Sequence, residues 1–409
     1  MVSALGGVEI ISYGTLYYCV AVVADKVALD LATSNEWIFA CFSWALFASA
    51  LTSLIAGRLM DRYSAGRAMK IAAAVGASSL GIAAISWSAV VFAIALFGMQ
   101  IASAFLFYEA AFVFLVQRDA VRAKRQITVL TLIVGFSSTL FWPLTSLLLS
   151  FISWREILWI YAASNILVSL PLIEWAVRMT SAGSTDQNKI RDLQVRSPSS
   201  PNVFDFVLVT LGFSLSTFVF SAFLGQMIPI LSSIGLSLEG AFVSALFGPS
   251  QVLIRLFAAS LTERIAAIQL TILSCVLLSA ATVVIALASE TIVGVTIFVV
   301  LLGFSSGLNS ICRGTLPLSM FGRDGYGSRV GLITGFRLST ASFAPLYFSS
   351  IQSQHGISNA FVSLAVCAMG SILAFVLVCI RSRRAVVQLG GIDEMRPKSS
   401  TTTSKSCDL

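Results

Sequence analysis

The segment GRLMDRYSAGRAMK, from Gly57 to Lys70, is a short polar stretch between two long apolar runs, at 37–56 and 69–87. It carries four basic residues and one acid, Asp61. Each flanking run is close to the roughly 20 apolar residues that cross a bilayer as a helix. The pattern therefore predicts two membrane helices joined by a basic loop at one face of the bilayer.

The composition extends this prediction to the whole chain. Of the 409 residues, 57% are hydrophobic and only 11% are charged, and the mean hydropathy is +0.91. A soluble domain carries about a quarter charged residues. The apolar runs are continuous and lack the period-two alternation of a membrane β-barrel. The fold class is therefore an all-α membrane protein.

Twelve transmembrane helices are expected in two groups of six. A Ser/Pro-rich, basic linker at 177–203 divides an N-terminal bundle, 1–176, from a C-terminal bundle, 204–380, and a disordered cytoplasmic tail follows at 381–409. The expected spans are 9–29, 37–56, 69–87, 89–116, 127–151, 155–176, 204–229, 240–261, 266–288, 291–319, 331–352 and 358–380. Six spans on each side of the linker favour two homologous, pseudo-symmetric halves.

The distribution of basic residues predicts the orientation. With the N-terminus in the cytoplasm, 21 of the 26 Lys and Arg residues lie in cytoplasmic segments, which satisfies the positive-inside rule. Both termini and the linker are then cytoplasmic, and the basic tail faces membrane lipids. Because topology accounts for the net charge of +7, nucleic-acid binding is not needed to explain it.

The loop at 57–70 resembles the signature of the major facilitator superfamily, apart from one extra residue in the turn. The residues that carry the resemblance are Gly57, Leu59, Asp61, Arg62, Gly66 and Arg67. Membership would imply two six-helix bundles that alternate access to a central site. A glycine at this position lets helices approach closely, and the acid can meet a helix N-terminus.

A narrower resemblance is to the monocarboxylate porters and the oxalate/formate antiporter. It rests on Ser153-Trp154-Arg155, Gly235-Leu-Ser237 with Ala241, and a basic residue in the eighth and eleventh spans, Arg255 and Arg337. The chain departs from the monocarboxylate porters at Gln251, where they carry an acid one turn before the arginine. This resemblance implies an anionic substrate.

Four charged residues lie inside spans: Glu109, Arg255, Arg313 and Arg337. Each costs at least about 2.5–3.5 kcal/mol at the centre of a bilayer, so intramembrane charges are functional candidates. All four lie about 9–15 Å from a cytoplasmic helix end, at 1.5 Å per residue. Glu109 is read as the only acid deep in a span.

The repeat relates two of these charges. Loops 117–126 and 320–330 correspond at an offset near 204, so Glu109 and Arg313 occupy equivalent positions in the two halves. We expect them to pair when the cytoplasmic side closes. Two alternatives remain open: each charge is satisfied separately by helix ends or water, or Glu109 carries a coupling proton.

The layer has a net charge of +2 when Glu109 is ionised, which favours an anionic solute. Arg255 and Arg337 are the candidate binding cations, because a guanidinium group holds a carboxylate through two hydrogen bonds. Tyr17 and Trp142 are the candidate aromatic contacts, since both lie near mid-depth in spans that would line the cavity.

The sequence thus predicts a secondary active transporter of a small organic, anionic solute, with possible proton coupling. It would be a monomer in a bacterial inner membrane. It contains no nucleotide-binding loop, metal-ligand cluster or catalytic motif, so neither an enzyme nor a cofactor is expected. One alternative is a proton-coupled efflux pump for drugs or metalloids, with Cys19, Cys41 and Cys312 as thiol ligands. A non-transporting membrane receptor is the other.

Overall fold

The computed structural model describes residues 1–181, 202–233, 243–261, 265–289 and 291–394, all of which lie in helices or their connections. The N-terminal half contains ten α-helices and two π-helical turns, η1 and η2, in its described part. Their bounds are α1 Val2–Tyr13, η1 Gly14–Tyr18, α2 Cys19–Asp30, α3 Asn35–Tyr63, α4 Ala65–Ala84, α5 Ala89–Ser103, α6 Tyr108–Arg118, α7 Ala123–Val134, α8 Ser137–Leu149, α9 Trp154–Ser164, η2 Asn165–Ser169 and α10 Leu170–Ser181.

The described C-terminal half consists of longer helices. They are α12 Val203–Ser233, α14 Phe247–Leu261, α15 Ala267–Ala288, α16 Ile292–Phe321, α17 Tyr326–His355 and α18 Ile357–Glu394. Each expected span overlaps one of these helices or a consecutive run of them. Among the described residues, nine such stretches are long and apolar enough to cross a membrane. The all-helical membrane class is confirmed.

Polar caps begin several of these helices. The Ser34 hydroxyl accepts a hydrogen bond from Trp37 N at the start of α3, and Thr291 accepts one from Gly294 N at the start of α16. Ser153 and Glu156 form a reciprocal capping box at the start of α9. Such caps satisfy amide groups that have no partner within the first helical turn.

The last helix continues past the end of the expected twelfth span. We expected residues 381–409 to lack regular structure, whereas α18 runs to Glu394. Contacts of Arg381, the first residue after the expected span, help to explain why the helix continues. Its Nε lies 2.7 Å from Asp205 Oδ1, and its guanidinium group lies over the Phe204 ring. These contacts tie the start of the extension to the first turn of α12. Most of the linker, residues 182–201, lies outside the described part.

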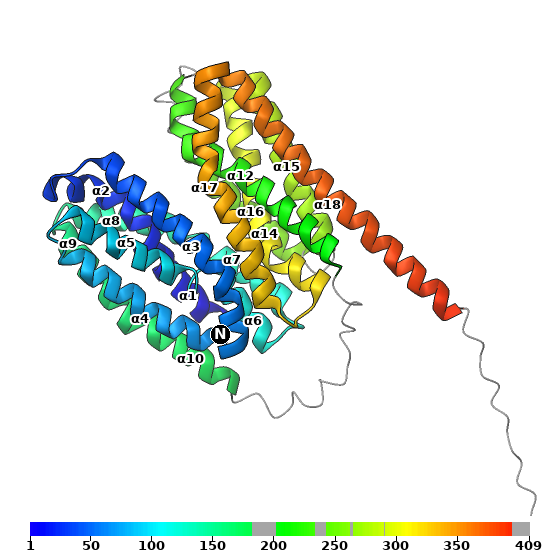
Figure 1. Cartoon of the computed structure of the whole chain (residues 1–409), viewed down its shortest axis with the longest axis horizontal. Coiled ribbons are helices and arrows are strands. Elements are labelled where there is room, and N and C mark those ends of the chain that lie inside the picture. The colour runs from blue at the N-terminus through cyan, green and yellow to red at the C-terminus, as the bar shows by residue number, and fades with distance from the viewer. Residues whose placement is uncertain (182–201, 234–242, 262–264, 290, 395–409) are drawn as a thin grey trace, which may run out of the picture.

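The helices form two groups that meet at one end (Figure 1). Helices α3, α6 and α7 of the N-terminal half pack there against α14, α16 and α17 of the C-terminal half. The basic loops lie at this end, since Arg323 Nη2 donates to Gln117 O (2.9 Å) and Lys124 Nζ donates to Ile265 O (3.1 Å). We call this region the closed end.

The closest approach at the closed end is between α3 and α17. A Cβ atom on Gly57 would overlap the carbonyl oxygen of Gly327, and one on Gly331 would lie 2.6 Å from Ser53 O. Asp61, one turn beyond Gly57, accepts hydrogen bonds from Gly327 N (3.0 Å) and Ser328 N (2.7 Å). A carboxylate of one half thus caps the N-terminus of a helix in the other half.

We expect Gly57→Ala to loosen this contact, because its methyl group cannot fit unless α3 and α17 separate. Hydrogen–deuterium exchange of the purified protein should increase by about tenfold or more over 326–335, if the added strain is about 1.4 kcal/mol or greater. Gly248→Ala is the matched control, since no described residue lies within 4 Å of a Cβ atom placed there. Unchanged exchange in Gly57→Ala would contradict this packing.

Candidate functional site

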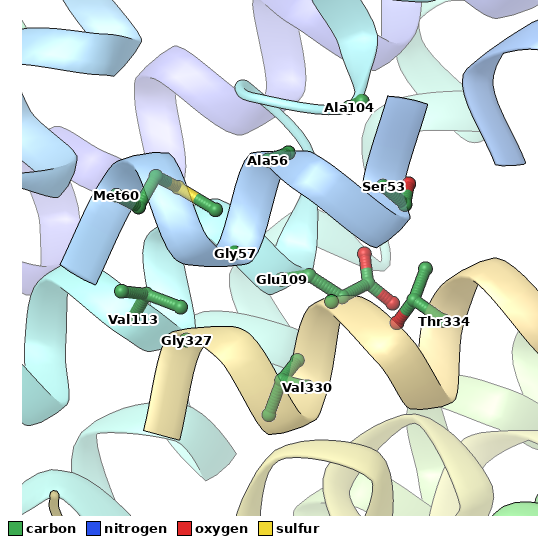
Figure 2. A pocket seen from close by; sticks show the side chains of 11 residues that line it. Ser53, Ala56, Gly57, Met60, Ala104, Glu109, Val113, Gly327, Val330 and Thr334 are labelled. Carbon is green, nitrogen blue, oxygen red and sulfur yellow. The ribbon is translucent and has the colours of Figure 1, made fainter. Parts of the chain in front are cut away.

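Glu109 lies where the fourth expected span divides into two helices. Helix α5 ends at Ser103, and α6 begins at Tyr108 after Phe107, whose backbone is extended. Glu109 therefore occupies the first turn of α6, where the positive end of the helix dipole favours a carboxylate. Figure 2 shows its side chain directed between α3 and α17, toward Ser53 and Thr334. The cavity there has a volume of about 10 Å³, enough for one water molecule.

Two arginines of the C-terminal half approach this carboxylate. Arg337 Nη2 of α17 donates to Glu109 Oε1 at 2.9 Å, and Arg313 Nη1 of α16 lies 3.7 Å from the same oxygen. The side chains are largely buried, with 6% of Arg337, 19% of Arg313 and 14% of Glu109 exposed. The Arg313 guanidinium also lies over the Tyr108 ring. The structure thus brings three of the four predicted charges together, with Arg337 as the nearer partner.

Arg255, the fourth predicted charge, binds a different part of the N-terminal half. The carbonyl of Thr131, near the end of α7, accepts from Gly135 N and also from Arg255 Nη1, each at 3.1 Å. Gly135 makes this contact possible, because a Cβ atom there would overlap Arg255 Nη1. Arg255 Nη2 makes a longer bond, 3.4 Å, to Gln251 Oε1.

Each of the three arginines has one buried N–H group that makes no hydrogen bond among the described residues. The Nε–H groups of Arg255, Arg313 and Arg337 are buried and find no acceptor among the described residues. A buried donor without an acceptor is costly, by about 1–3 kcal/mol or more when the group is charged. These three donors all belong to arginines that reach across from the C-terminal half to the N-terminal half.

The two aromatic residues predicted to contact the solute, Tyr17 and Trp142, both belong to the N-terminal half. Tyr17 is in the π-helical turn η1, and Trp142, with 52% of its surface exposed, is in α8. Tyr18 packs edge-on against both, at centroid distances of 5.2 Å and 5.9 Å. Tyr13, one turn before Tyr17, instead stacks on Phe107 at 3.8 Å, next to the Glu109 cluster. π-Helical turns are frequent at functional sites.

A second acid was missed from the sequence. We read Glu109 as the only acid deep in a span, and this reading is wrong because Glu9 of α1 is completely buried. The expected first span began at residue 9, whereas α1 begins at Val2, which places Glu9 two turns inside the helix. The apolar stretch before it, MVSALGGV, was the available signal.

The remaining signature residues are structural at this end of the molecule. A Cβ atom on Gly66 would lie 2.7 Å from Val177, so the glycine permits close packing of α4 on α10. Arg62 lies over the neighbouring Tyr63 ring, and Arg67 is exposed on the first turn of α4. Gln117 was not predicted, although its amide binds Met60 O and Ala65 N and so fixes the loop.

The motif Ser153-Trp154-Arg155 lies at the opposite end from the closed end. Arg155 is paired with Asp30 at the end of α2, donates to Ser86 O, and stacks over the Trp154 ring. These contacts tie three connections of the N-terminal half together. The other motif of the narrower resemblance, Gly235-Leu-Ser237 with Ala241, lies outside the described residues.

The three cysteines proposed as thiol ligands belong to different helices. Cys19 begins α2, Cys41 is in α3, and Cys312 is in α16. Cys19 and Cys312 are buried, and the Cys19 thiol donates to Thr15 O. Within the described ranges, no three His, Cys, Asp or Glu residues are grouped as a metal site would require.

Comparison with known proteins places these features in a family. Residues 8–345 match the model of the Major Facilitator Superfamily. Among solved structures, a double Trp mutant of XylE has a TM-score of 0.73 at 12% identity, covering 92% of this chain and 93% of that chain. The human organic anion transporter MFSD10 (TETRAN) gives 0.68 at 14% identity, covering 91% and 98%.

FucP in the outward conformation is also similar, with a TM-score of 0.61, 13% identity and coverage of 91% and 98%. A search of curated proteins found no match. The low identities mean that these likenesses concern the fold, whereas the family model covers most of the chain. The protein belongs to the major facilitator superfamily.

Proposed function

We propose that the protein is a secondary active transporter that moves a small organic anion by alternating access. The observation that carries this proposal is the set of three buried Nε–H donors on Arg255, Arg313 and Arg337. An arginine holds a carboxylate best when Nε and one Nη bind its two oxygens. A carboxylate solute would supply the acceptors that this conformation lacks.

The charge balance supports an anion rather than a neutral solute. Glu109 offsets one of the three cations, and the backbone carbonyl bound by Arg255 carries no formal charge. An excess of buried positive charge is unfavourable in a medium of low dielectric constant unless an anion enters. MFSD10 is described as an organic anion transporter, and a solute of that class would suit this chain. A monocarboxylate is the narrower proposal.

The two-bundle arrangement supports alternating access. The described contacts between the halves run from Phe47 with Phe343, near the middle of α3 and α17, to Asp61 with Ser328 at the closed end. If the basic loops face the cytoplasm of a bacterial cell, as the positive-inside rule predicts, this conformation is closed to the cytoplasm. Both termini would then be cytoplasmic, with the chain functioning as a monomer in the inner membrane.

Counterflow in proteoliposomes tests the substrate class. We expect labelled acetate, L-lactate, benzoate or oxalate to exchange, and labelled xylose not to exchange. Arg255→Gln should lower carboxylate exchange by about tenfold or more, because a charged hydrogen bond contributes about 1.5–3 kcal/mol. Arg122→Gln is the control, since Arg122 is 81% exposed in a loop.

The competing functions give different outcomes in the same assay. Exchange of xylose without any carboxylate would contradict an anion site. Exchange of arsenite or of a cationic drug in place of the carboxylates would favour the efflux alternative. The absence of exchange with every solute, in protein that remains folded, would favour the receptor alternative.

Within this function, we propose that Glu109 and Arg337 form a gate that stabilises the closed end. Breaking a buried ion pair from one side costs about 3–5 kcal/mol. Glu109→Gln and Arg337→Gln should each lower the melting temperature by several degrees. The exchanged pair, Glu109→Arg with Arg337→Glu, should recover more than half of that loss. If the double variant is no more stable than the single variants, the pair is not a gate.

Gly135→Ala tests the contact between Arg255 and the carbonyl oxygen of Thr131. The added methyl group displaces Arg255 from Thr131 O, which removes a charge-assisted contact between the halves. We expect faster hydrogen–deuterium exchange over 123–134, by about tenfold for each 1.4 kcal/mol lost. Gly248→Ala, in the same helix as Arg255, should leave that exchange as in the wild type.

A further inference from the structure

Glu9 is a buried acid without a compensating group. Its side chain is fully buried in α1, and neither carboxylate oxygen has a hydrogen-bond donor among the described residues. The hydroxyl of Ser12, one turn further along the same helix, is also buried and makes no hydrogen bond in the described part. Buried polar groups are otherwise almost always hydrogen-bonded.

Among the described residues, no cation lies within 4 Å of the Glu9 carboxylate, and the described ion pairs of this region involve Glu109 instead. The ionisable groups near Glu9 are Tyr13 of the same helix, and Tyr108 and Glu109 of α6. Arg313 lies over the Tyr108 ring and is paired with Glu109. Helices α7 and α10 present the apolar side chains of Ile133 and Leu172 to neighbouring positions of α1, and α8 presents Phe141.

The charged groups at the ends of α7 and α10 are engaged elsewhere. Lys124 of α7 donates to Ile265 O, and Arg125 is exposed on the first turn of the same helix. Glu174 and Arg178 of α10 bind each other, and Glu174 also binds Lys70. An ionised Glu9 would therefore have a second carboxylate, Glu109, as its described charged neighbour.

Glu9 and Glu109 therefore differ in the groups that surround their carboxyl groups. Glu109 has Arg337 and Arg313 within 4 Å, so its negative charge is compensated. Glu9 has neither a hydrogen-bond donor nor a cation within 4 Å among the described residues, and two nearby carboxyl groups do not readily ionise together. We propose that Glu9 is the proton-binding site of this transporter and is protonated when the closed end is shut, whereas Glu109 stays ionised as the partner of the arginines.

This assignment rests on the proposed transport function and gives it a stoichiometry. Separation of α6 and α17 would admit water at the closed end, and the Glu9 carboxylic acid would release one proton and become a carboxylate. The proton would leave on the side that has opened, and after the end closes again Glu9 would take up a new proton from the opposite side of the membrane. One proton moved together with one monocarboxylate transfers no net charge, so the membrane potential would not oppose uptake.

Infrared spectroscopy tests the protonation state without any substrate. Purified full-length protein at pH 7 should show the carbonyl absorption of a buried, protonated carboxylic acid. Glu9→Gln should remove it, and Glu9→Asp should retain it at a shifted frequency. Glu36→Gln should leave it intact, since Glu36 is exposed at the start of α3. If the absorption is absent from the wild type or persists in Glu9→Gln, Glu9 does not hold the proton.

A transport measurement separates this inference from the proposed function. Proteoliposomes loaded with a pH-sensitive dye should take up one proton with each labelled L-lactate in the wild type and in Glu36→Gln. In Glu9→Gln, residual lactate flux should occur without proton uptake and should not respond to a pH gradient. Proton-coupled flux in Glu9→Gln would overturn the assignment.

A wild type that exchanges none of the panel carboxylates would refute the anion function alone, because the infrared result would still decide the state of Glu9. An absorption that appears only when sodium is removed would identify a sodium site instead and would also overturn the proton assignment.

Discussion

The contact on which the closed conformation depends is a carboxylate of one half held by guanidinium groups of the other. Glu109 lies on the first turn of α6, and Arg337 and Arg313 reach it from α17 and α16. Lipid cannot replace such a contact, because unpaired charge in a hydrocarbon environment is costly. The close approach of α3 to α17 at Gly57 and the cap formed by Asp61 support this contact. Both hold the two halves close enough for Glu109 to meet the arginines.

The arginines do more than close the interface, because they are not fully satisfied by it. A structural ion pair would be expected to use its donors on protein acceptors, as Arg155 does with Asp30 and Ser86 O at the opposite end. Arg255, Arg313 and Arg337 each leave a buried Nε–H without an acceptor in the described residues. Under the proposed function, these three buried Nε–H groups would be the donors available to a solute.

The sequence predicted the architecture well because the bilayer imposes a strong constraint on each span. Hydropathy located the helices, and the loop at 57–70 indicated the family. Two features could not be reached in this way. The break before Tyr108 depends on tertiary packing and places Glu109, and the approach of Arg255 to Thr131 O depends on the absence of a side chain at Gly135. Glu9 was missed for another reason. The first span was predicted to begin at this charged residue, so Glu9 was taken as the end of a helix and not as a residue inside it.

The charge state of Glu9 changes the net charge of the region that holds the arginines, although only Glu109 is paired with them among the described residues. If both acids were ionised, the two acids and three arginines would sum to +1. If Glu9 is neutral, they sum to +2, so an anion gains more by entering when Glu9 is protonated. Opening the closed end lets water offset this charge, whereas occlusion requires the solute. Proton binding at Glu9 and anion binding at the arginines would therefore favour each other, which couples the two without direct contact between them.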